Sequence, residues 1–371
     1  MEQINVLIIG GGVVGCAVAW AASARHEDVF IAEQMPRVGM MTSARNSGVV
    51  HSGLYYAAGS LKARHCVAGN ALTYEFCRAH NVPHRRTGKL IVATSAEEER
   101  ELHHLLEKGS GNGLEGLRVI GRDEILKREP HIRGVAALEI PSTGIVSAED
   151  LTKTYARLAV EQGASILAPT RVVALEPRGD GVRATLETEG AREEVEARCV
   201  VNSAGLYADE VAAMMGNTSW RIYPVRGEYC EVARSRSHLV NGLVYPLPRA
   251  DHLSLGVHFT KTLWGTLLLG PTARYIDDKN DYERNREPVE EFARRAQHLL
   301  PEIRVEDLTP GYSGIRPKLV PPGGQGPADF VITRDTQQPR VIHLVGIESP
   351  GLTAAISIAR DVAGMIDETL K

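Results

Sequence analysis

A glycine-rich turn near the amino terminus constrains the fold of this chain more than any other feature. Residues 5–9 form a short apolar run typical of a strand buried on both faces, and the glycine motif at residues 10–15 follows at once. Small residues at 16–23 predict a helix, and residues 29–32 predict a second strand that ends at Glu33. A strand, a Gly-x-Gly-x-x-Gly turn, a helix and a following acidic residue together predict a Rossmann-like unit that binds a dinucleotide.

Each residue of this motif has a physical task. Gly10 permits the tight turn, Gly12 lets the backbone approach a pyrophosphate, and Gly15 lets the helix pack closely on the strand. The helix N-terminus offers unpaired N–H groups and the positive end of its dipole to the phosphates. Glu33 can accept hydrogen bonds from a ribose diol, and its charge would repel the 2′-phosphate of NADP. The motif leaves both FAD and NAD open.

The composition is that of a globular protein with more than one folding unit. The 371 residues are 43% hydrophobic and 24% charged, and the formal net charge is −4. This charge and an aromatic content of 5% argue against a nucleic-acid-binding protein. None of the five cysteines forms a CxxC pair, which favours a reducing compartment and predicts neither a disulfide framework nor a metal site.

The segments after the first unit indicate where a ligand would lie. Residues 42–56 are rich in glycine, serine and polar groups, and we expect them to form a loop at the carboxyl edge of the sheet, where ligands bind. A strand at 199–202 ends in small residues, which marks a second place of close backbone approach. A buried strand at 341–345 leads to a helix at 352–370, with Ser349 as its expected N-cap.

The middle of the chain has a different character. Between residues 220 and 318, successive short strands with turns between them, one at 253–257, predict a mostly antiparallel sheet and hence a second domain. We therefore predict an α/β chain, α+β overall.

Four blocks of sequence carry a resemblance to a known family. They are residues 10–15 with Glu33, residues 45–56, residues 255–260, and residues 311–318 with 346–353. Through them the chain resembles the flavin-dependent oxidoreductases of the D-amino-acid oxidase superfamily, and within that group the L-2-hydroxyglutarate dehydrogenases and oxidases. The blocks span nearly the whole chain, but the chain is shorter than typical members and its region 270–310 departs from them.

The resemblance implies a Rossmann-like FAD-binding domain that is discontinuous in sequence, with an inserted substrate domain. We expect the FAD-binding domain at residues 1–85, 145–215 and 325–371, and the mostly antiparallel substrate domain at 86–144 and 216–324. The flavin is expected at their interface without a covalent link, although the superfamily leaves a link through His51 open. Arg45 is expected to face either a cofactor phosphate or neighbouring backbone. The residues expected to contact FAD are Gly10, Gly12, Val13, Val14, Gly15, Glu33, Gln34, Thr42, Ser43, Arg45, Asn46, Ser47, Gly48, Val49, His51, Val172, Ser203, Ala204, Gly205, Arg316, Gly346, Glu348, Ser349, Pro350, Gly351, Leu352 and Thr353.

The activity implied is oxidation of a 2-hydroxy acid, above all L-2-hydroxyglutarate to 2-oxoglutarate, by hydride transfer to flavin N5. Such a reaction needs a base for the hydroxyl proton, and His51 and His258 are the candidates. Arg316 matches the superfamily position that clamps the α-carboxylate. The candidates for a second carboxylate are Lys318, Arg226, Tyr245 and Tyr55.

Other functions remain open from sequence. The same fold serves amino-acid or amine oxidases and dehydrogenases, whose substrates do not require a histidine base. Glycerol-3-phosphate oxidation would need a basic cluster for phosphate that is not evident. A non-catalytic electron-relay flavoprotein subunit and a nicotinamide-binding regulator are the remaining alternatives.

The expected partners are a small carboxylate substrate and an electron acceptor, which is oxygen, a quinone or another carrier. No apolar run is long enough to span a bilayer, and the apolar start of the chain carries Glu2 and no basic residue before it, which argues against a secretory leader. We expect a cytoplasmic protein; an acceptor in a membrane would allow peripheral contact with the inner membrane. The oligomeric state is left open.

Overall fold

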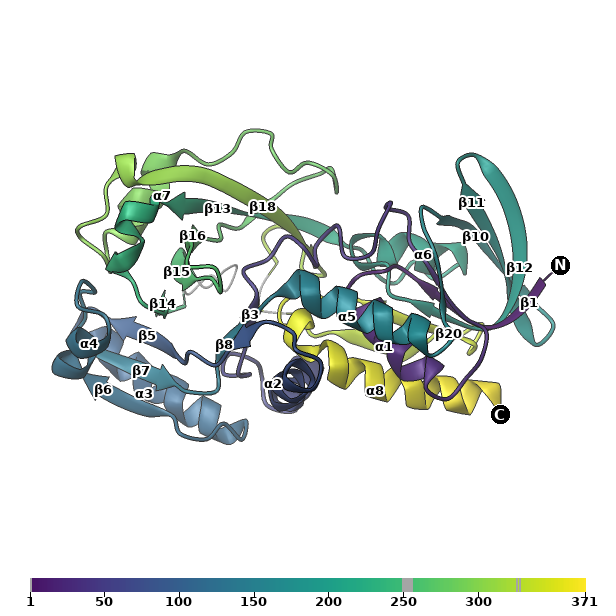
Figure 1. The fold of residues 1–371 in the computed structure, drawn as a ribbon, viewed down its shortest axis with the longest axis horizontal. Helices are drawn as coiled ribbons and strands as arrows, with labels where there is room; N and C mark the ends of the chain where they lie inside the picture. The colour runs from purple at the N-terminus through teal and green to yellow at the C-terminus, as the bar shows by residue number, and fades with distance from the viewer. Residues whose placement is uncertain (1, 249–255, 325, 327) are drawn as a thin grey trace.

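The computed structural model describes residues 2–248, 256–324, 326 and 328–371. The molecule is elongated, with two halves that each contain a large sheet, and both chain ends lie at the far end of one half (Figure 1). The predicted strand at 253–257 lies mostly outside the described residues, as does Leu255 of the third resembling block.

The first sheet has eight strands in the order β10-β11-β12-β1-β2-β9, with β20 beside β12 and β19 beside β20. Strands β9, β2, β1, β12 and β20 run parallel, whereas β10, β11 and β19 are antiparallel to their neighbours. The strands are β1 (Glu2–Ile9), β2 (Val29–Ala32), β9 (Ser165–Leu167), β10 (Arg171–Arg178), β11 (Gly181–Thr188), β12 (Ala191–Asn202), β19 (Val331–Arg334) and β20 (Val341–Val345). This sheet with its helices confirms the predicted Rossmann-like unit.

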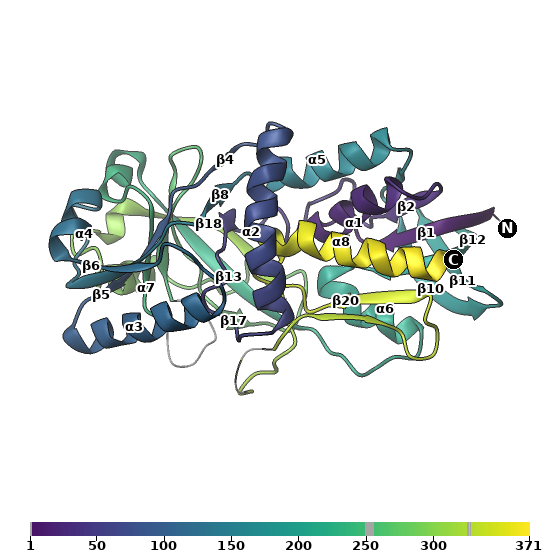
Figure 2. The same cartoon turned by 90° about the horizontal axis from the view of Figure 1, so that it is seen from below.

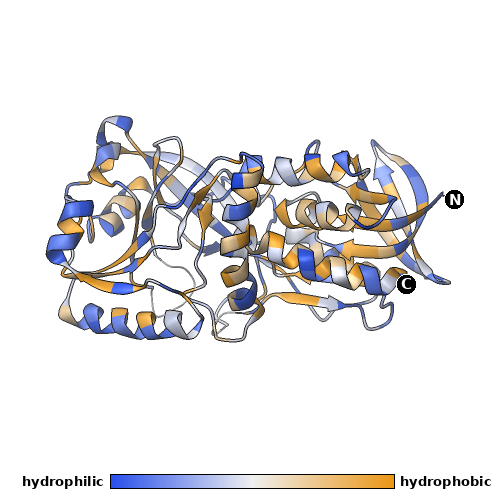
Figure 3. Ribbon diagram, turned by 60° about the horizontal axis from the view of Figure 1, so that its bottom comes forward, coloured by the Kyte–Doolittle hydropathy of each residue, from blue (hydrophilic) through white to orange (hydrophobic). Residues whose placement is uncertain are grey.

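The sheet is buried because successive side chains of β1 serve two different cores. Val6 and Ile8 belong to the core formed with the helices on one face, and Leu7 and Ile9 to the core on the other. The helices of the first face are α1 (Val13–Ser23), α5 (Ala148–Glu161) and α8 (Gly351–Leu370). The short helix α6 (Ala208–Met214) packs on the second face against β10 and β20. Figure 3 shows the hydrophobic residues concentrated along the central elements of both halves.

The second sheet has nine strands in the order β17-β13-β16-β15-β14-β5-β7-β6, with β18 beside β13. All its pairs are antiparallel except β14 with β5. Its elements are β5 (Lys89–Ala93), β6 (Arg118–Gly121), β7 (Ala136–Ile140), β13 (Tyr223–Val232), β14 (Leu243–Pro246), β15 (His258–Lys261), β16 (Leu267–Gly270), β17 (Arg274–Tyr275) and β18 (Leu308–Lys318), with helices α3 (Ala96–Gly111), α4 (Arg122–Arg128) and α7 (Val289–Ala296). The mostly antiparallel sheet is therefore confirmed.

A third, small sheet lies where the chain passes between the halves. It consists of β3 (Val49–Val50), β8 (Gly144–Val146) and β4 (His84–Arg85) in that order. Helix α2 (Leu61–Ala79) crosses between the halves and packs against α8 (Figure 2). Strand β3 thus delivers the polar loop at 51–56 to the junction of the two large sheets.

Candidate active site

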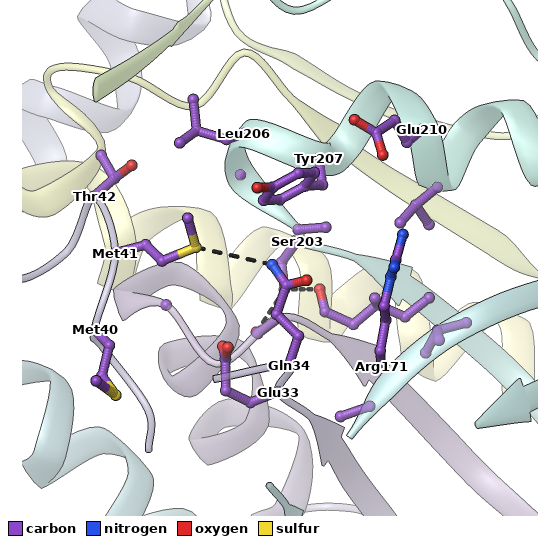
Figure 4. Close-up of a pocket in the computed structure, with 18 of the residues that line it drawn as sticks. Glu33, Gln34, Met40, Met41, Thr42, Arg171, Ser203, Leu206, Tyr207 and Glu210 are labelled. Atoms are coloured by element: carbon purple, nitrogen blue, oxygen red, sulfur yellow. Dashed lines mark hydrogen bonds between the residues drawn. The ribbon is translucent and has the colours of Figure 1, made fainter. Parts of the chain in front are cut away.

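The first sheet ends at its carboxyl edge in a cavity lined by the glycine motif. The cavity encloses about 830 Å3 of space, part of it open to solvent, and lies between the ends of β1, β2 and β12 and the loop at 39–43 (Figure 4). The expected cofactor residues in its lining are Gly10, Gly12, Glu33, Gln34, Thr42, Ser43, Val172, Ser203, Ala204 and Gly205. Residues distant in sequence are therefore brought together where a dinucleotide is expected.

The three glycines of the motif differ in what surrounds them. Gly10 has φ +104°, and a Cβ there would lie 2.7 Å from the carbonyl oxygen of Ser203. A Cβ on Gly15 would lie 2.0 Å from the carbonyl oxygen of Gly10. At Gly12 the only neighbour of such a Cβ is Ser43 Oγ at 3.2 Å. Gly10 therefore serves the turn and Gly15 the packing of helix on strand, while Gly12 keeps the approach to the cavity open.

Glu33 shapes one side of the cavity. Its Oε2 accepts a hydrogen bond of 2.6 Å from the N–H of Gly11, and its Oε1 accepts one of 2.7 Å from the N–H of Met35. Burial raises the pKa of this carboxyl group, and the two backbone hydrogen bonds act in the opposite direction. Each oxygen retains acceptor capacity for a ribose hydroxyl.

The first turn of α1 presents backbone N–H groups toward the cavity. The N–H of Val13 donates to Ser43 Oγ at 2.9 Å, whereas those of Gly12 and Val14 have no hydrogen-bond partner among the described residues. Unpaired donors at the positive end of a helix dipole suit a phosphate. These donors, the Glu33 carboxylate and an apolar wall that includes Met214 fit the adenosine and pyrophosphate part of FAD.

The loop that follows is stabilised by its own hydrogen bonds. Asn46 Nδ2 donates to the carbonyl oxygens of Thr42 at 3.2 Å and Ser43 at 2.7 Å, and Asn46 Oδ1 accepts from the N–H of Gly48 at 2.9 Å. Asn46 therefore orders the loop that carries Thr42 and Ser43 to the cavity.

Arg45 faces neighbouring backbone, one of its two expected environments, and does not line the cavity. Its Nη1 donates to the carbonyl oxygen of Ser313 at 3.3 Å, and its guanidinium lies over the ring of Tyr282 at 4.3 Å. Arg45 thus connects the cofactor loop to β18.

The start of α8 contacts His51. The N–H of His51 donates to Thr353 Oγ1 at 2.9 Å, and His51 Nε2 lies 3.4 Å from Ser349 Oγ. The N-cap prediction for Ser349 is wrong: Pro350 occupies that position and Ser349 lies outside the helix, within reach of His51. The backbone N–H groups of Leu352 and Thr353 have no partner among the described residues, so the helix end offers donors beside His51.

The carboxylate of Glu348 forms ion pairs with both Lys62 and Lys318. Lys62 Nζ lies 2.9 Å from Glu348 Oε1, and Lys318 Nζ lies 3.7 Å from Glu348 Oε2. Burial alone would raise the pKa of Glu348, but the two lysines hold it below its ordinary value. Lys318 is consequently a weaker candidate for a substrate carboxylate than a cation with no acidic partner, because it already lies beside Glu348.

His258 lies against Tyr245 at the start of β15. The two rings stack with centroids 3.7 Å apart, and His258 Nδ1 lies 2.9 Å from the carbonyl oxygen of Gly256. Burial lowers the pKa of His258 to about 3, and the nearby charges of Lys89 and Arg316 act in the same direction. Burial likewise lowers the pKa of His51 to about 3. The two expected bases are thus neutral at pH 7 and within electrostatic reach of each other.

Arg316 of β18 lies within electrostatic reach of His258 and has one hydrogen bond to a protein group among the described residues. Its Nη1 donates to the carbonyl oxygen of Thr272 at 3.3 Å, and no carboxylate pairs with it among the described residues. A Cβ on Gly227 would lie 3.0 Å from both terminal nitrogens of Arg316, so a glycine there leaves room for the guanidinium. A planar cation that forms no ion pair with the described residues is suited to a carboxylate.

The surroundings of Arg226 do not favour the substrate-binding prediction for this residue. Arg226 is 0% exposed, and it forms ion pairs with Glu228 at 2.9 Å and Asp281 at 3.0 Å. It also donates to the carbonyl oxygens of Asp281, Arg284 and Asn285. All its donor directions are used within the protein, so it ties β13 to the segment 281–285 and is not available to a ligand.

Sequence reasoning missed Lys89, the first residue of β5. Its ammonium lies 4.7 Å from the centre of the Tyr55 ring and 4.6 Å from that of Tyr245, so it connects two residues that were expected to bind substrate. The signal in the sequence was a single charged residue at the head of the apolar run at 90–93. In the cavity, sequence reasoning also missed Arg171, Tyr207 and Glu210 (Figure 4).

The described residues contain neither a membrane-spanning helix nor a metal-binding group of side chains. No helix there combines the length and the apolar character needed to cross a membrane. No group of histidine, cysteine and acidic side chains in this part of the chain could hold a metal ion. All five cysteines are buried and free.

Comparison with known proteins gives concordant results. A profile of FAD dependent oxidoreductases matches residues 5–365. Mitochondrial L-2-hydroxyglutarate dehydrogenase of Mus musculus is 33% identical, over 98% of this chain and 88% of the relative. L-2-hydroxyglutarate dehydrogenase of Indibacter alkaliphilus is 33% identical, over 97% of this chain and 98% of the relative. A solved structure of dithionite-reduced L-alpha-glycerophosphate oxidase from Mycoplasma pneumoniae, with FAD bound, is similar with a TM-score of 0.90 and 27% identity, over 99% of this chain and 95% of that chain.

Proposed function

The chain belongs to the family of FAD dependent oxidoreductases, and we propose that it oxidises L-2-hydroxyglutarate to 2-oxoglutarate. Relatives named for this activity match almost the full length of the chain. When bound, FAD supplies the acceptor for the hydride that leaves the substrate carbon. The contribution of the chain is to bind the acid, orient it and remove its hydroxyl proton.

Arg316 is the proposed clamp for the substrate α-carboxylate. It has free donors and no carboxylate partner among the described residues, and a guanidinium can bind a carboxylate through two parallel hydrogen bonds. Such a clamp fixes the orientation of the substrate carbon and its hydroxyl relative to the histidines.

The observation that carries the proposal is the state of His258. A carbonyl oxygen can only accept, so the contact with Gly256 places the ring proton on Nδ1, and the Nε2 lone pair has no hydrogen-bond partner among the described residues. The low pKa keeps this lone pair available at neutral pH. His258 is therefore the proposed base for the hydroxyl proton, and the imidazolium that forms shares its charge with the carbonyl oxygen of Gly256.

His51 is the second candidate for the base. Its Nε2 lies at a long hydrogen-bonding distance from Ser349 Oγ, and its backbone is anchored on α8 through Thr353. We propose that His51 orients the substrate hydroxyl together with Ser349. The unpaired N–H groups at the start of α8 face the same region and would stabilise negative charge there.

The test is anaerobic mixing of the purified holoenzyme with single substrates while the flavin absorbance is followed. L-2-hydroxyglutarate should bleach the flavin, and its D-enantiomer is the matched control. His258→Gln should lower the rate of bleaching by about 100-fold or more, with unchanged FAD content. Bleaching by amino acids or by glycerol 3-phosphate in place of L-2-hydroxyglutarate would overturn the proposal.

The electron acceptor belongs to the same proposal. The family implies an acceptor, and we propose that it is a carrier other than oxygen, because the relatives are named dehydrogenases. Turnover with a soluble quinone but little with oxygen would support this, and rapid formation of hydrogen peroxide in air would contradict it.

A further inference from the structure

Lys89 is a buried cation with no carboxylate partner among the described residues. It is 3% exposed, and its one polar contact there is a hydrogen bond of 3.5 Å from Nζ to the Tyr55 hydroxyl. The faces of the Tyr55 and Tyr245 rings hold the ammonium between them. The site thus presents a positive charge in an aromatic enclosure.

This arrangement sets Lys89 apart from the other buried lysine and arginine residues of the described chain. Lys62 is paired with Glu348 at 2.9 Å, and Arg226 is paired with Glu228 at 2.9 Å and Asp281 at 3.0 Å. A buried charge without a counter-ion is costly for the folded state. Such a charge is expected where a ligand supplies the missing anion.

The position of Lys89 relative to the site points to the kind of anion. Lys89 and Arg316 both act electrostatically on His258, and Lys89 acts on His51 as well. The two cations lie on different strands, β5 and β18, and converge on the same pair of histidines. Two cations around one base match a hydroxy acid that carries a carboxylate at each end.

We propose that Lys89, together with the Tyr55 hydroxyl, binds the distal carboxylate of the substrate and so selects dicarboxylates over acids with an uncharged tail. The proposal rests on the proposed function, since it assigns the second carboxylate of the same substrate. Arg226 and Lys318 do not compete for this role, because each already has a carboxylate partner. Tyr245 forms one wall of the subsite and separates Lys89 from His258 by its stacked ring.

The pH dependence of substrate binding gives a test without mutation. Burial lowers the pKa of Lys89 to about 7. Of the groups near it, burial raises the pKa of Tyr55, Tyr245 and Cys66, and it lowers the pKa of the two histidines to about 3. Lys89 is therefore the group of this cluster that titrates near neutrality. The free enzyme loses the cation as the pH rises through about 7.

The experiment compares two five-carbon substrates that differ at one end. L-2-hydroxyglutarate carries the distal carboxylate, and L-2-hydroxypentanoate has a methyl group in its place. For the wild type, KM for the dicarboxylate should rise with pH above about 7, by about tenfold for each pH unit, while KM for the monocarboxylate stays level. Lys89→Met should lower kcat/KM for the dicarboxylate by about 10- to 100-fold and for the monocarboxylate by less than about twofold.

A binding measurement separates this inference from the proposed function. Calorimetric titration of the holoenzyme with 2-oxoglutarate and with 2-oxopentanoate needs no turnover, and Lys89→Met should weaken only the first. Lys153→Met, which removes an exposed lysine of α5, is the matched control for loss of one positive charge. Equal losses for both acids, or an unchanged preference, would overturn the role of Lys89 even if L-2-hydroxyglutarate is oxidised.

Two further outcomes of these experiments also test the role of Lys89. If neither acid bleaches the flavin, the proposed function fails, and preferential binding of the dicarboxylate to the wild type still tests Lys89. If Lys89→Met does not fold, the wild-type pH profile and the titrations stand alone. A level KM for the dicarboxylate from pH 6 to pH 9 would then refute the inference.

Discussion

Replacing Lys89 with methionine should make the folded protein more stable, although it impairs substrate binding. The ammonium is buried and lacks an anion, so its pKa falls from 10.5 in the unfolded chain to about 7 in the folded one. At about 1.4 kcal/mol for each tenfold change, this difference corresponds to a cost of roughly 5 kcal/mol. Methionine has a similar length and removes the charge, so we expect a gain on the order of 2–5 kcal/mol in the free energy of unfolding at pH 6.

The lowered pKa of Lys89 makes the stability gain of Lys89→Met depend on pH. Below pH 7 the lysine is protonated in both states and the full cost is present. Between about 7 and 10.5 the unfolded chain holds a proton that the folded chain has released, so wild-type stability from this group rises with pH by about 1.4 kcal/mol per unit. The advantage of Lys89→Met should therefore be largest at pH 6 and nearly absent at pH 10.

The assay is urea unfolding of both proteins at pH 6, 8 and 9.5 with saturating FAD, followed by circular dichroism. A variant that is less stable than the wild type at pH 6 would refute the reasoning, because it would mean that Lys89 stabilises the fold. A difference that does not change with pH would refute the assignment of the low pKa.

Three further predictions concern the cofactor and the fold. Gly12→Val should weaken FAD binding by about tenfold or more in a fluorescence titration, because the valine side chain would meet Ser43 Oγ and enter the cavity. The control is Gly111→Val, where a side chain would meet open space and FAD affinity should not change. Equal affinities of the two variants would contradict the role of Gly12. Arg226→Met should lower the free energy of unfolding by about 3–5 kcal/mol in urea, because the buried Glu228 loses its nearest cation, and a stable variant with a raised KM would favour Arg226 as a substrate residue. Acid precipitation should release all the flavin into the supernatant, and flavin retained on the chain would indicate a covalent link.

The amino-terminal unit could be predicted from sequence because its determinants are local. The alternation of Val6, Leu7, Ile8 and Ile9 between two cores requires only that the strand be buried on both faces. The turn at Gly10 and the packing of α1 depend on residues within a few positions of one another. Ten of the 22 residues that line the cavity at this end were accordingly expected.

The substrate side was predicted less completely. His258, Arg316 and Tyr245 were selected from sequence and lie in one cluster, but β18 and α7 were not expected as elements. Ser349 was expected to cap α8, whereas its hydroxyl lies beside His51, nearly 300 residues earlier in the chain. A capping pattern describes neighbours along the chain and does not register a competing partner from another segment.

The sequence by itself determined that this chain contains a dinucleotide-binding unit and which residues carry the oxidoreductase motifs, because strand, turn and helix patterns act over short stretches of chain. Only the tertiary structure decided which cations are free to bind an acid. Arg226 is not free, because it forms an ion pair with Asp281, 55 residues away in the sequence. Lys89 is free, because no acidic side chain among the described residues pairs with it. Coulomb energy depends on the distance between charges in space and on their burial, and neither quantity can be read from the linear order of the residues.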